Sequence, residues 1–234
     1  MQVIPSIDIR NDRSRVIWWP GASTGTGTPT DRPERIATAF VAAGAPAIHL
    51  VDLDGPGQGR PVNLTAISAV SRAVAVPLQL AGGVDGPEQV ELAFAAGATR
   101  VVLPMWLAAE DPGRLAACLR IAGDWLAVGL DARPERIAEY PWPGGRAPSL
   151  ADVVGGLADA GVRRFILSHG GRTPDPALLA GLVAGVDADL VVAGGVTEVG
   201  TLAALRDAGV SGVILGEALF TGAIDLAAAI RAAA

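Results

Sequence analysis

Short apolar runs alternate with longer amphipathic stretches along the chain. From Leu190 the sequence reads LVVA, then the pair Gly194-Gly195, then a stretch with helical periodicity. A second apolar run, Gly212–Leu215, ends on Gly216 and is followed by another such stretch. Apolar runs without a polar face, each followed by a helix, predict parallel strands in β/α units. Glycines at the strand ends let backbone N–H groups approach an anion closely.

The same order of elements occurs in the first half of the chain. The glycine pair at 82–83 precedes the pair at 194–195 by the same number of residues that separates Gly97 from Gly209. A constant offset between matching landmarks indicates an internal repeat. We therefore expect the chain to consist of two similar halves.

Apolar runs predict eight strands, and helical stretches follow most of them. The predicted strands are 3–9, 47–52, 78–80, 100–103, 125–130, 165–168, 190–193 and 212–215. The predicted helices include 33–43, 62–74, 87–96 and 149–160. Asn63 is the expected cap of the second helix. Eight β/α units without a linker predict one α/β domain over residues 1–234, a (β/α)8 TIM barrel made of two half-barrels. Its active site is expected at the carboxyl ends of the strands.

Charge and composition exclude several classes of function. The formal net charge is -6 and all 18 basic residues are arginine, which excludes a basic nucleic-acid surface and lysine chemistry. The single cysteine, Cys118, excludes an internal disulfide and is expected in the core. No run is long enough to span a membrane, and no signal-peptide pattern opens the sequence. We expect a monomeric cytoplasmic protein with no nucleic-acid or membrane partner.

Two aspartates occupy matching positions in the two halves. Asp8 lies in SIDIR and Asp131 in GLDAR, each followed two positions later by an arginine. A strand-end aspartate commonly only caps the next turn. A matched pair on opposite sides of one barrel opening instead favours general acid–base catalysis, because different surroundings give the two carboxyl groups different pKa values.

Other residues near the predicted strand ends are weaker candidates. The glycine pairs at 82–83 and 194–195, together with Gly216, either bind phosphate or only permit tight turns. His49 and His169 are predicted near the ends of the second and sixth strands, where a buried histidine bonded to the backbone is the commoner arrangement. We expect no metal site, because the chain has only two histidines and one cysteine.

Two long loops are candidates for ligand contacts. Residues 10–31 form an insertion whose Gly- and Thr-rich part, 21–29, is expected to be a mobile lid or binding loop. Trp18 and Trp19 either belong to this lid or pack on the barrel wall. Trp142, in the loop after the fifth strand, either stacks on a flat ring or anchors its loop.

Several motifs together resemble one enzyme family. They are IPSID at 4–8, HLVDLD at 49–54, GRPVN at 59–63, GLDAR at 129–133 and the two glycine pairs. This set is similar to the ProFAR isomerase family of histidine biosynthesis over nearly the whole chain. HLVDLD with GRPVN is the most specific part, because the sister barrel, the cyclase of imidazole glycerol phosphate synthase, differs there.

The resemblance implies an Amadori rearrangement of an aminoaldose to an aminoketose, on a phosphorylated substrate with two phosphoribosyl arms and without a metal or cofactor. By this resemblance Asp8 is the general base at ribose C2 and Asp131 the general acid at the ring oxygen. Thr173 matches a threonine after the sixth strand, and Trp142 matches a tryptophan that stacks near the imidazole. The substrate and phosphate contacts so implied are Gly82, Gly83, Gly171, Gly194, Gly195 and Gly216, with His49 as a further candidate.

The first of the two phosphate sites departs from the family pattern. Asp85 stands where the family has an arginine, and its charge would repel a phosphate. Residues 104–106, Pro-Met-Trp, replace a Gly-Ser or Gly-Thr pair, and proline has no N–H to donate. The turn 169–173 is also shorter than in the family. We therefore expect an anion to bind near Gly216 and the pair 194–195 rather than at residues 104–106.

Three functions remain open. The first is a ProFAR isomerase with a remodelled first phosphate site. The second is a diverged barrel enzyme whose substrate carries one phosphate; phosphoribosylanthranilate isomerase fits this poorly, because Asp8 stands near the place of its catalytic cysteine. The third is a catalytically idle barrel that binds a metabolite or a partner protein, against which the intact Asp8 and Asp131 argue.

Overall fold

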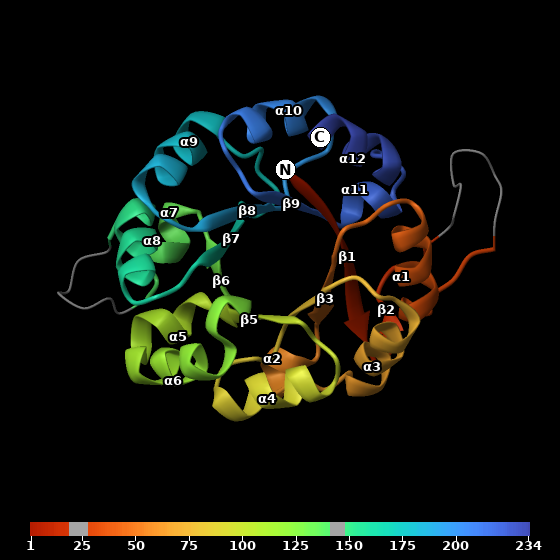
Figure 1. The fold of residues 1–234 in the computed structure, drawn as a ribbon, viewed down its shortest axis with the longest axis horizontal. Helices are drawn as coiled ribbons and strands as arrows, with labels where there is room; N and C mark the ends of the chain where they lie inside the picture. Colours follow the sequence, from red (N-terminus) through yellow and green to blue (C-terminus); the bar gives the residue numbers. More distant parts are fainter. Residues whose placement is uncertain (19–27, 141–147) are drawn as a thin grey trace.

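The chain forms one closed barrel (Figure 1). The computed structural model describes residues 1–18, 28–140 and 148–234. The strands are β1 (Gln2–Arg10), β2 (Arg13–Ser14), β3 (Ile48–Asp52), β4 (Leu78–Ala81), β5 (Arg100–Pro104), β6 (Leu126–Asp131), β7 (Arg164–Ser168), β8 (Asp189–Ala193) and β9 (Gly212–Leu215). From β3 to β9 neighbours pair in parallel in chain order, and β1 pairs with both β3 and β9. The predicted (β/α)8 barrel is confirmed, with β2 as an added antiparallel edge.

Helices surround the barrel on the outside (Figure 1). They are α1 (Pro33–Ala42), α2 (Gly55–Gln58), α3 (Leu64–Ala73), α4 (Pro87–Ala95), α5 (Met105–Glu110), α6 (Pro112–Ala122), α7 (Pro134–Ile137), α8 (Leu150–Asp159), α9 (Pro176–Gly185), α10 (Gly200–Asp207), α11 (Glu217–Phe220) and α12 (Leu226–Ala233). The single-turn helices α2 and α7 were not predicted, because four residues are too few to show helical periodicity.

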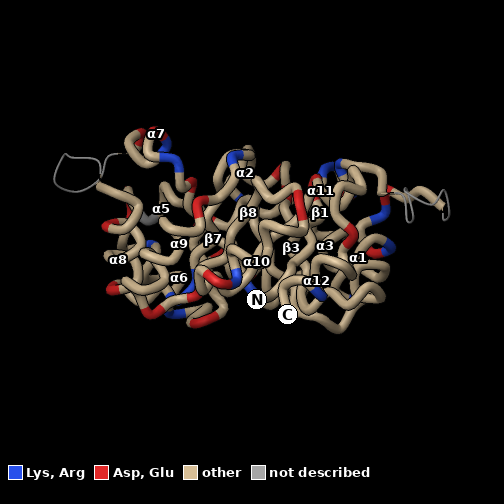
Figure 2. Tube along the Cα trace, turned by 90° about the horizontal axis from the view of Figure 1, so that it is seen from above, with Lys and Arg blue, Asp and Glu red and all other residues tan. Residues whose placement is uncertain are grey.

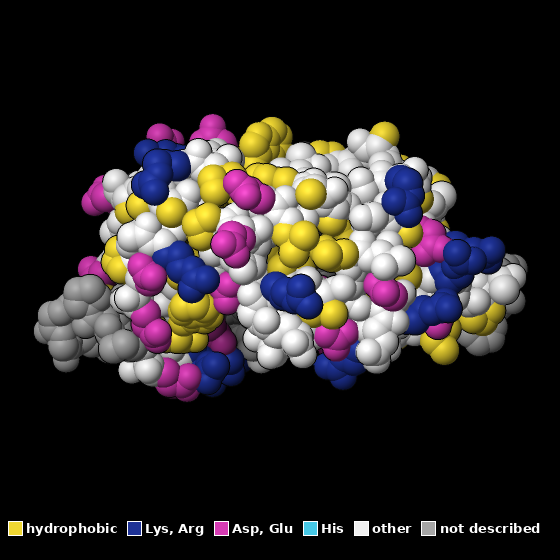
Figure 3. Space-filling model, turned by 90° about the horizontal axis from the view of Figure 1, so that it is seen from below, with side chains coloured by type: hydrophobic (Ala, Val, Ile, Leu, Met, Phe, Trp, Pro, Cys, Tyr) yellow, Lys and Arg dark blue, Asp and Glu magenta, His cyan; other side chains and the backbone are white. Residues whose placement is uncertain are grey.

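The two ends of the barrel differ. Helices α2, α7 and α11 follow strand ends and lie at one end, with both termini at the other (Figure 2). We call the end formed by the carboxyl ends of the strands the mouth. On the face in Figure 3, acidic and basic side chains are interspersed and form no continuous basic surface. Among the described residues, no helix has the length and apolar character needed to cross a bilayer.

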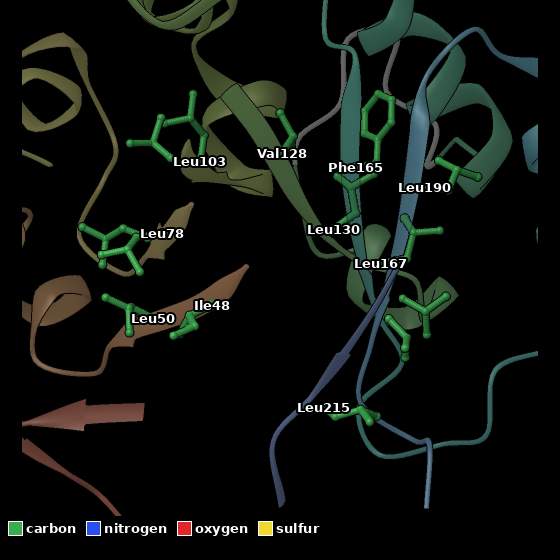
Figure 4. Packing of buried hydrophobic residues seen from close by; sticks show 14 of the residues in the cluster. Ile48, Leu50, Leu78, Leu103, Val128, Leu130, Phe165, Leu167, Leu190 and Leu215 are labelled. Carbon is green, nitrogen blue, oxygen red and sulfur yellow. The ribbon is translucent and has the colours of Figure 1, made fainter. Parts of the chain in front are cut away.

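Two separate apolar layers hold the barrel together. The larger layer lies between strands and helices, where strand residues such as Leu50, Leu78 and Phe165 are fully or almost fully buried (Figure 4). The smaller layer fills the barrel and consists of Ile4, Ala47, Val102, Ala127, Ile166, Val191 and Ile214. A barrel of eight strands has room for only small inward side chains, mixed with a few larger ones. Cys118 is buried in the larger, outer layer, so its predicted place in the core is confirmed.

Two local predictions were wrong. Trp125 does not begin a strand, because it is the last residue of a 3₁₀ turn, Gly123–Trp125. Its ring is half-exposed, and Arg100 Cζ lies 5.8 Å from the ring centroid. Asn63 stands at the cap position of α3, but its side chain does not bond to the helix. Its Oδ1 accepts from the Asp12 backbone N–H instead, its Nδ2 donates to Asp52 and Asp54, and Asp12 Oδ1 accepts from the Ala66 N–H in the first turn of α3.

Candidate active site

The two aspartates of the repeat lie on opposite sides of the barrel. Asp8 is near the end of β1, and Asp131 is the last residue of β6. The same number of strand pairings separates β1 from β6 in either direction around the closed sheet. Ile4 and Ala127 point into the barrel, and alternate residues of a strand face the same side. Both carboxyl groups therefore face the inside of the mouth.

Asp8 is paired with an arginine at the edge of a cavity. Arg15 Nε and Nη2 each lie 3.2 Å from Asp8 Oδ2, and the Arg15 backbone N–H donates to the Asp8 carbonyl oxygen at 2.8 Å. The cavity has a volume of about 280 Å³ and lies between Ser6, Asp8 and Arg15 on one side and Gly216, Glu217 and Phe220 on the other. The Asp8 side chain is 32% exposed, so a ligand in this cavity can reach it.

Asp131 is held by two arginines. Arg133 donates from Nε to Oδ1 at 2.8 Å and from Nη2 to Oδ2 at 2.5 Å, and its backbone N–H donates to Oδ1 at 3.2 Å. Arg136 Nε lies 3.7 Å from Oδ2. The hydrogen bonds from Arg133 hold the pKa of Asp131 below its ordinary value, outweighing the opposite effect of burial. In this arrangement Asp131 is a paired anion.

Three of the predicted phosphate-binding glycines are required by packing. Gly82, Gly83 and Gly195 have φ values of 99°, 73° and 75°, which other residues rarely adopt. A Cβ at Gly82 or Gly195 would also overlap the backbone carbonyl of Asp52 or Arg172. These glycines thus let each β/α turn pack against the preceding one.

Two other glycines border open space. Gly171 and Gly194 also have positive φ, 81° and 77°, but no described atom lies within 4 Å of where their Cβ would be. Gly216 has a negative φ of -116° and lines the cavity beside Asp8. Gly216 therefore borders the cavity beside Asp8, while Gly171 and Gly194 are exposed and their Cβ positions are unobstructed.

The HLVDLD and GRPVN motifs meet at a buried carboxyl group. Asp52 is fully buried and accepts five hydrogen bonds, from the backbone N–H groups of Asp54, Gly55, Val62 and Asn63 and from Asn63 Nδ2. The contact joins the end of β3 to the start of α3. Sequence reasoning identified the motif but missed this structural role; the signal was an Asp-x-Asp at a strand end followed by a distant Asn.

His49 lies within β3 rather than near its end as predicted, and it pairs in register with Ser6, which borders the cavity beside Asp8. It is the second residue of β3, it is buried, and its Nδ1 lies 2.9 Å from Gln79 Nε2. Burial lowers the pKa of His49 to about 4, so the ring is neutral. Gln79 Oε1 accepts from Arg100, whose pKa is lowered to about 10 by burial and by Arg164. Arg100 is the first residue of β5, and sequence periodicity gave no sign of this group of polar side chains.

His169 directly follows β7 and does lie at the mouth. It is buried, and its Nε2 has no hydrogen-bond partner among the described residues. Burial lowers the pKa of His169, and the nearby Asp131 opposes this effect. His49 and His169 are therefore not equivalent, because they lie at different depths in the barrel.

The remaining predicted contacts lie in loops. Thr173 is exposed in the turn between β7 and α9. Trp142, Trp19 and most of the candidate lid 21–29 fall outside the described residues. Trp18 packs edge-on against Phe40 at 5.4 Å, so it belongs to the barrel wall.

The region predicted as the altered first phosphate site contains an arginine from another element. Arg114, at the start of α6, lies 3.7 Å from Asp85 Oδ1 and offsets its charge. Its guanidinium passes so close to Gly86 that a Cβ there would come within 2.8 Å. Pro104 ends β5 and leads directly into α5, while Met105 is buried and Trp106 packs against the outer apolar layer.

The described residues contain no candidate metal centre. Within the part of the chain that the structure describes, no three His, Cys, Asp or Glu residues are grouped as metal ligands would be.

Comparison with known proteins identifies the family. A model of the family described as "Histidine biosynthesis protein" matches residues 2–225. The chain belongs to this family. A relative in Herpetosiphon aurantiacus is 38% identical over 99% of this chain and 98% of its own length. Relatives in Chloroflexus aggregans (36%; 100% and 98%) and Roseiflexus castenholzii (37%; 99% and 99%) are similar in extent. All three are named 1-(5-phosphoribosyl)-5-((5-phosphoribosylamino)methylideneamino) imidazole-4-carboxamide isomerase, which is the ProFAR isomerase of the resemblance above.

Proposed function

We propose that this chain is a ProFAR isomerase, an aldose–ketose isomerase of histidine biosynthesis. The observation that carries the proposal is the pair Asp8 and Asp131, which face the inside of one barrel mouth from opposite strands. Near-full-length relatives with this name support the choice of substrate. A metabolite-binding barrel without catalysis has no need for two opposed carboxyl groups.

The proposed reaction divides the proton transfers between the two aspartates. Asp131 donates a proton to the ribose ring oxygen, the C1–O bond breaks, and the nitrogen lone pair forms a C=N bond. Asp8 then removes the proton from C2 to give an enolamine, which becomes the aminoketone when C1 gains a proton and the C2 hydroxyl loses one. Asp8 suits the base because its carboxylate borders the cavity, and general acid–base transfers of this kind contribute about 10²–10⁴-fold each.

The proposed phosphate contacts are unequal in the two halves. Gly171, Gly194 and Gly216 border open space, and we assign one phosphate of the substrate to this side, with Gly195 supporting the turn. Gly82 and Gly83, at the first phosphate site, take the other phosphate. There Arg114 replaces the arginine that the family has at Asp85. Thr173 and Trp142 are assigned to the substrate by resemblance alone.

A substrate with a single phosphate is the second candidate. Pro104 offers no N–H at the end of β5, and α5 begins at the next residue. These features weaken the first phosphate site and leave the second unaffected.

Turnover of ProFAR by the purified protein tests the proposal. We expect turnover that falls at least 10²-fold in Asp8→Asn and in Asp131→Asn, while circular dichroism shows both variants folded. Absence of turnover from the folded wild type contradicts the proposal, and isomerisation of a one-phosphate aminoaldose instead would favour the second candidate. Light scattering on the same sample tests the further expectation of a monomer.

A further inference from the structure

Arg133 lies between the carboxyl group of Asp131 and the glycine turn that follows β7. Its guanidinium makes two parallel hydrogen bonds to Asp131. The same guanidinium lies against Gly170: a Cβ at Gly170 would come within 2.7 Å of Arg133 Cζ and Nε. Gly170 has a φ of 57°, a backbone conformation that favours glycine.

The turn under Arg133 adjoins the open space assigned to a phosphate. Gly171, the next residue, has no described atom within 4 Å of its Cβ position. The carbonyl group of Arg172 packs directly on Gly195, which brings this turn against the glycine pair after β8. An oxyanion at these glycines is therefore close to the guanidinium that now holds Asp131. Guanidinium groups bind carboxylates and phosphates with the same two-bond geometry, so the two anions compete for it.

The pairing conflicts with the proposed chemistry of Asp131. A general acid must carry a proton, whereas a carboxylate bonded to a guanidinium through both oxygens is held in its charged form. Either Asp131 never acts as an acid, or Arg133 leaves it when substrate binds.

We propose that Arg133 couples anion binding to the protonation of Asp131: an oxyanion bound at the Gly170–Gly171 turn takes the guanidinium, and Asp131 then takes up a proton. The inference rests on the proposed function for its biological meaning, since Arg133 here is a positioning residue that acts through Asp131. Its exchange needs only a side-chain rotation, because Arg133 already contacts both places.

Other charged groups also lie near Asp131 and Arg133. Arg136 on α7 lies 3.7 Å from Asp131 Oδ2 and stays beside it when Arg133 leaves. The carboxylates of Glu135 and Glu139 attract the Arg133 guanidinium electrostatically. Arg172 Nη2 lies 2.9 Å from Glu135 Oε1, and His169 lies on the β7 side of Asp131. The neighbouring Arg136 provides a matched control, because it contacts the same carboxylate, whereas the atoms nearest the Gly170 Cβ position all belong to Arg133.

Carbon-13 NMR of the Asp131 carboxyl group, assigned with Asp131→Asn, tests the coupling without turnover. Sulfate is the probe, because it stays dianionic through the titration of a carboxyl group, and sodium chloride of equal ionic strength is the control. In wild type we expect sulfate to raise the Asp131 midpoint by about one pH unit. In Arg133→Gln the midpoint is already raised by at least that amount, and sulfate adds nothing. Arg136→Gln keeps the sulfate effect, and Arg133→Lys lies between wild type and Arg133→Gln.

Two results overturn the proposal. One is a wild-type midpoint that sulfate leaves where sodium chloride leaves it. The other is a sulfate effect that persists in folded Arg133→Gln. A protein that shows the coupling but does not turn over ProFAR refutes the proposed function alone, so the two failures are distinguishable.

Discussion

Replacing the buried Asp52 with alanine should destabilise the barrel without touching the proposed chemistry. Five N–H donors point at this carboxyl group, and those from Gly55, the Asn63 backbone and the Asn63 side chain are buried. A buried donor left without an acceptor costs about 1–3 kcal/mol, so three of them predict a loss of about 3 kcal/mol or more. For a chain of this length each kcal/mol lowers Tm by about 2–4 °C, which gives a fall of about 6–12 °C.

Urea unfolding followed by circular dichroism measures the loss, with Asp54→Ala as the matched control. Asp54 also accepts from Asn63 Nδ2, at 3.0 Å, but its side chain is 28% exposed and water can replace it. We expect a far smaller change in Asp54→Ala. Asp52→Asn should fall between the two, because the amide keeps one acceptor oxygen.

A small effect would refute this reasoning. If Asp52→Ala unfolds within about 0.5 kcal/mol of wild type, the five hydrogen bonds do not join β3 to α3 as described, or water fills the site at no cost. A large effect in Asp54→Ala would equally contradict the assignment of stability to burial.

Three further outcomes follow from the structure. Gly195→Ala should destabilise the protein more than Gly194→Ala, as measured by Tm, because both have positive φ but only Gly195 lies against a neighbouring backbone; the strain alone is worth about 1–2 kcal/mol. His49 has its pKa lowered to about 4, so its neutral form stabilises the fold above about pH 6.5, and this stability is lost as pH falls towards 4. Between pH 7 and pH 4 this contribution to the free energy of unfolding falls by roughly 3 kcal/mol. Urea unfolding at both pH values measures the change, and the His49→Gln variant should lack it. In steady-state kinetics, Arg114→Gln should raise KM for ProFAR with little change in kcat, since Arg114 is assigned to binding of one phosphate; an unchanged KM would count against that assignment.

The barrel was predictable because its pattern repeats along the chain. Apolar runs ending in glycine, with a constant offset between halves, specify parallel strands and therefore which residues end them. That placed Asp8 and Asp131 at the mouth on opposite sides. The same logic failed for His49, because the run 47–52 has its histidine near the beginning and the pattern does not report depth.

The sequence did not predict which side chains bind to Asp131 and Asp85. Nothing in GLDAR distinguishes an arginine that points into solvent from Arg133, which folds back onto Asp131 and Gly170. Arg114 reaches Asp85 from a different β/α unit, so the position-by-position departure from the family looked like a lost charge. Side-chain contacts across units depend on rotamers and helix packing, which periodicity does not encode.

The two similar halves that the sequence repeat predicts create a problem of orientation for a ligand with two similar ends. A molecule with two similar phosphorylated arms can enter a two-fold receptor in two directions related by a half-turn, and only one presents the reacting ribose to the proposed base, Asp8. The affinity for productive binding is reduced by whatever fraction binds backwards. The halves of this barrel are unequal: α5 and Pro104 crowd one side, while Gly171 and Gly194 leave the other open. Under the proposed function, this inequality between the halves favours one of the two directions in which the substrate can bind.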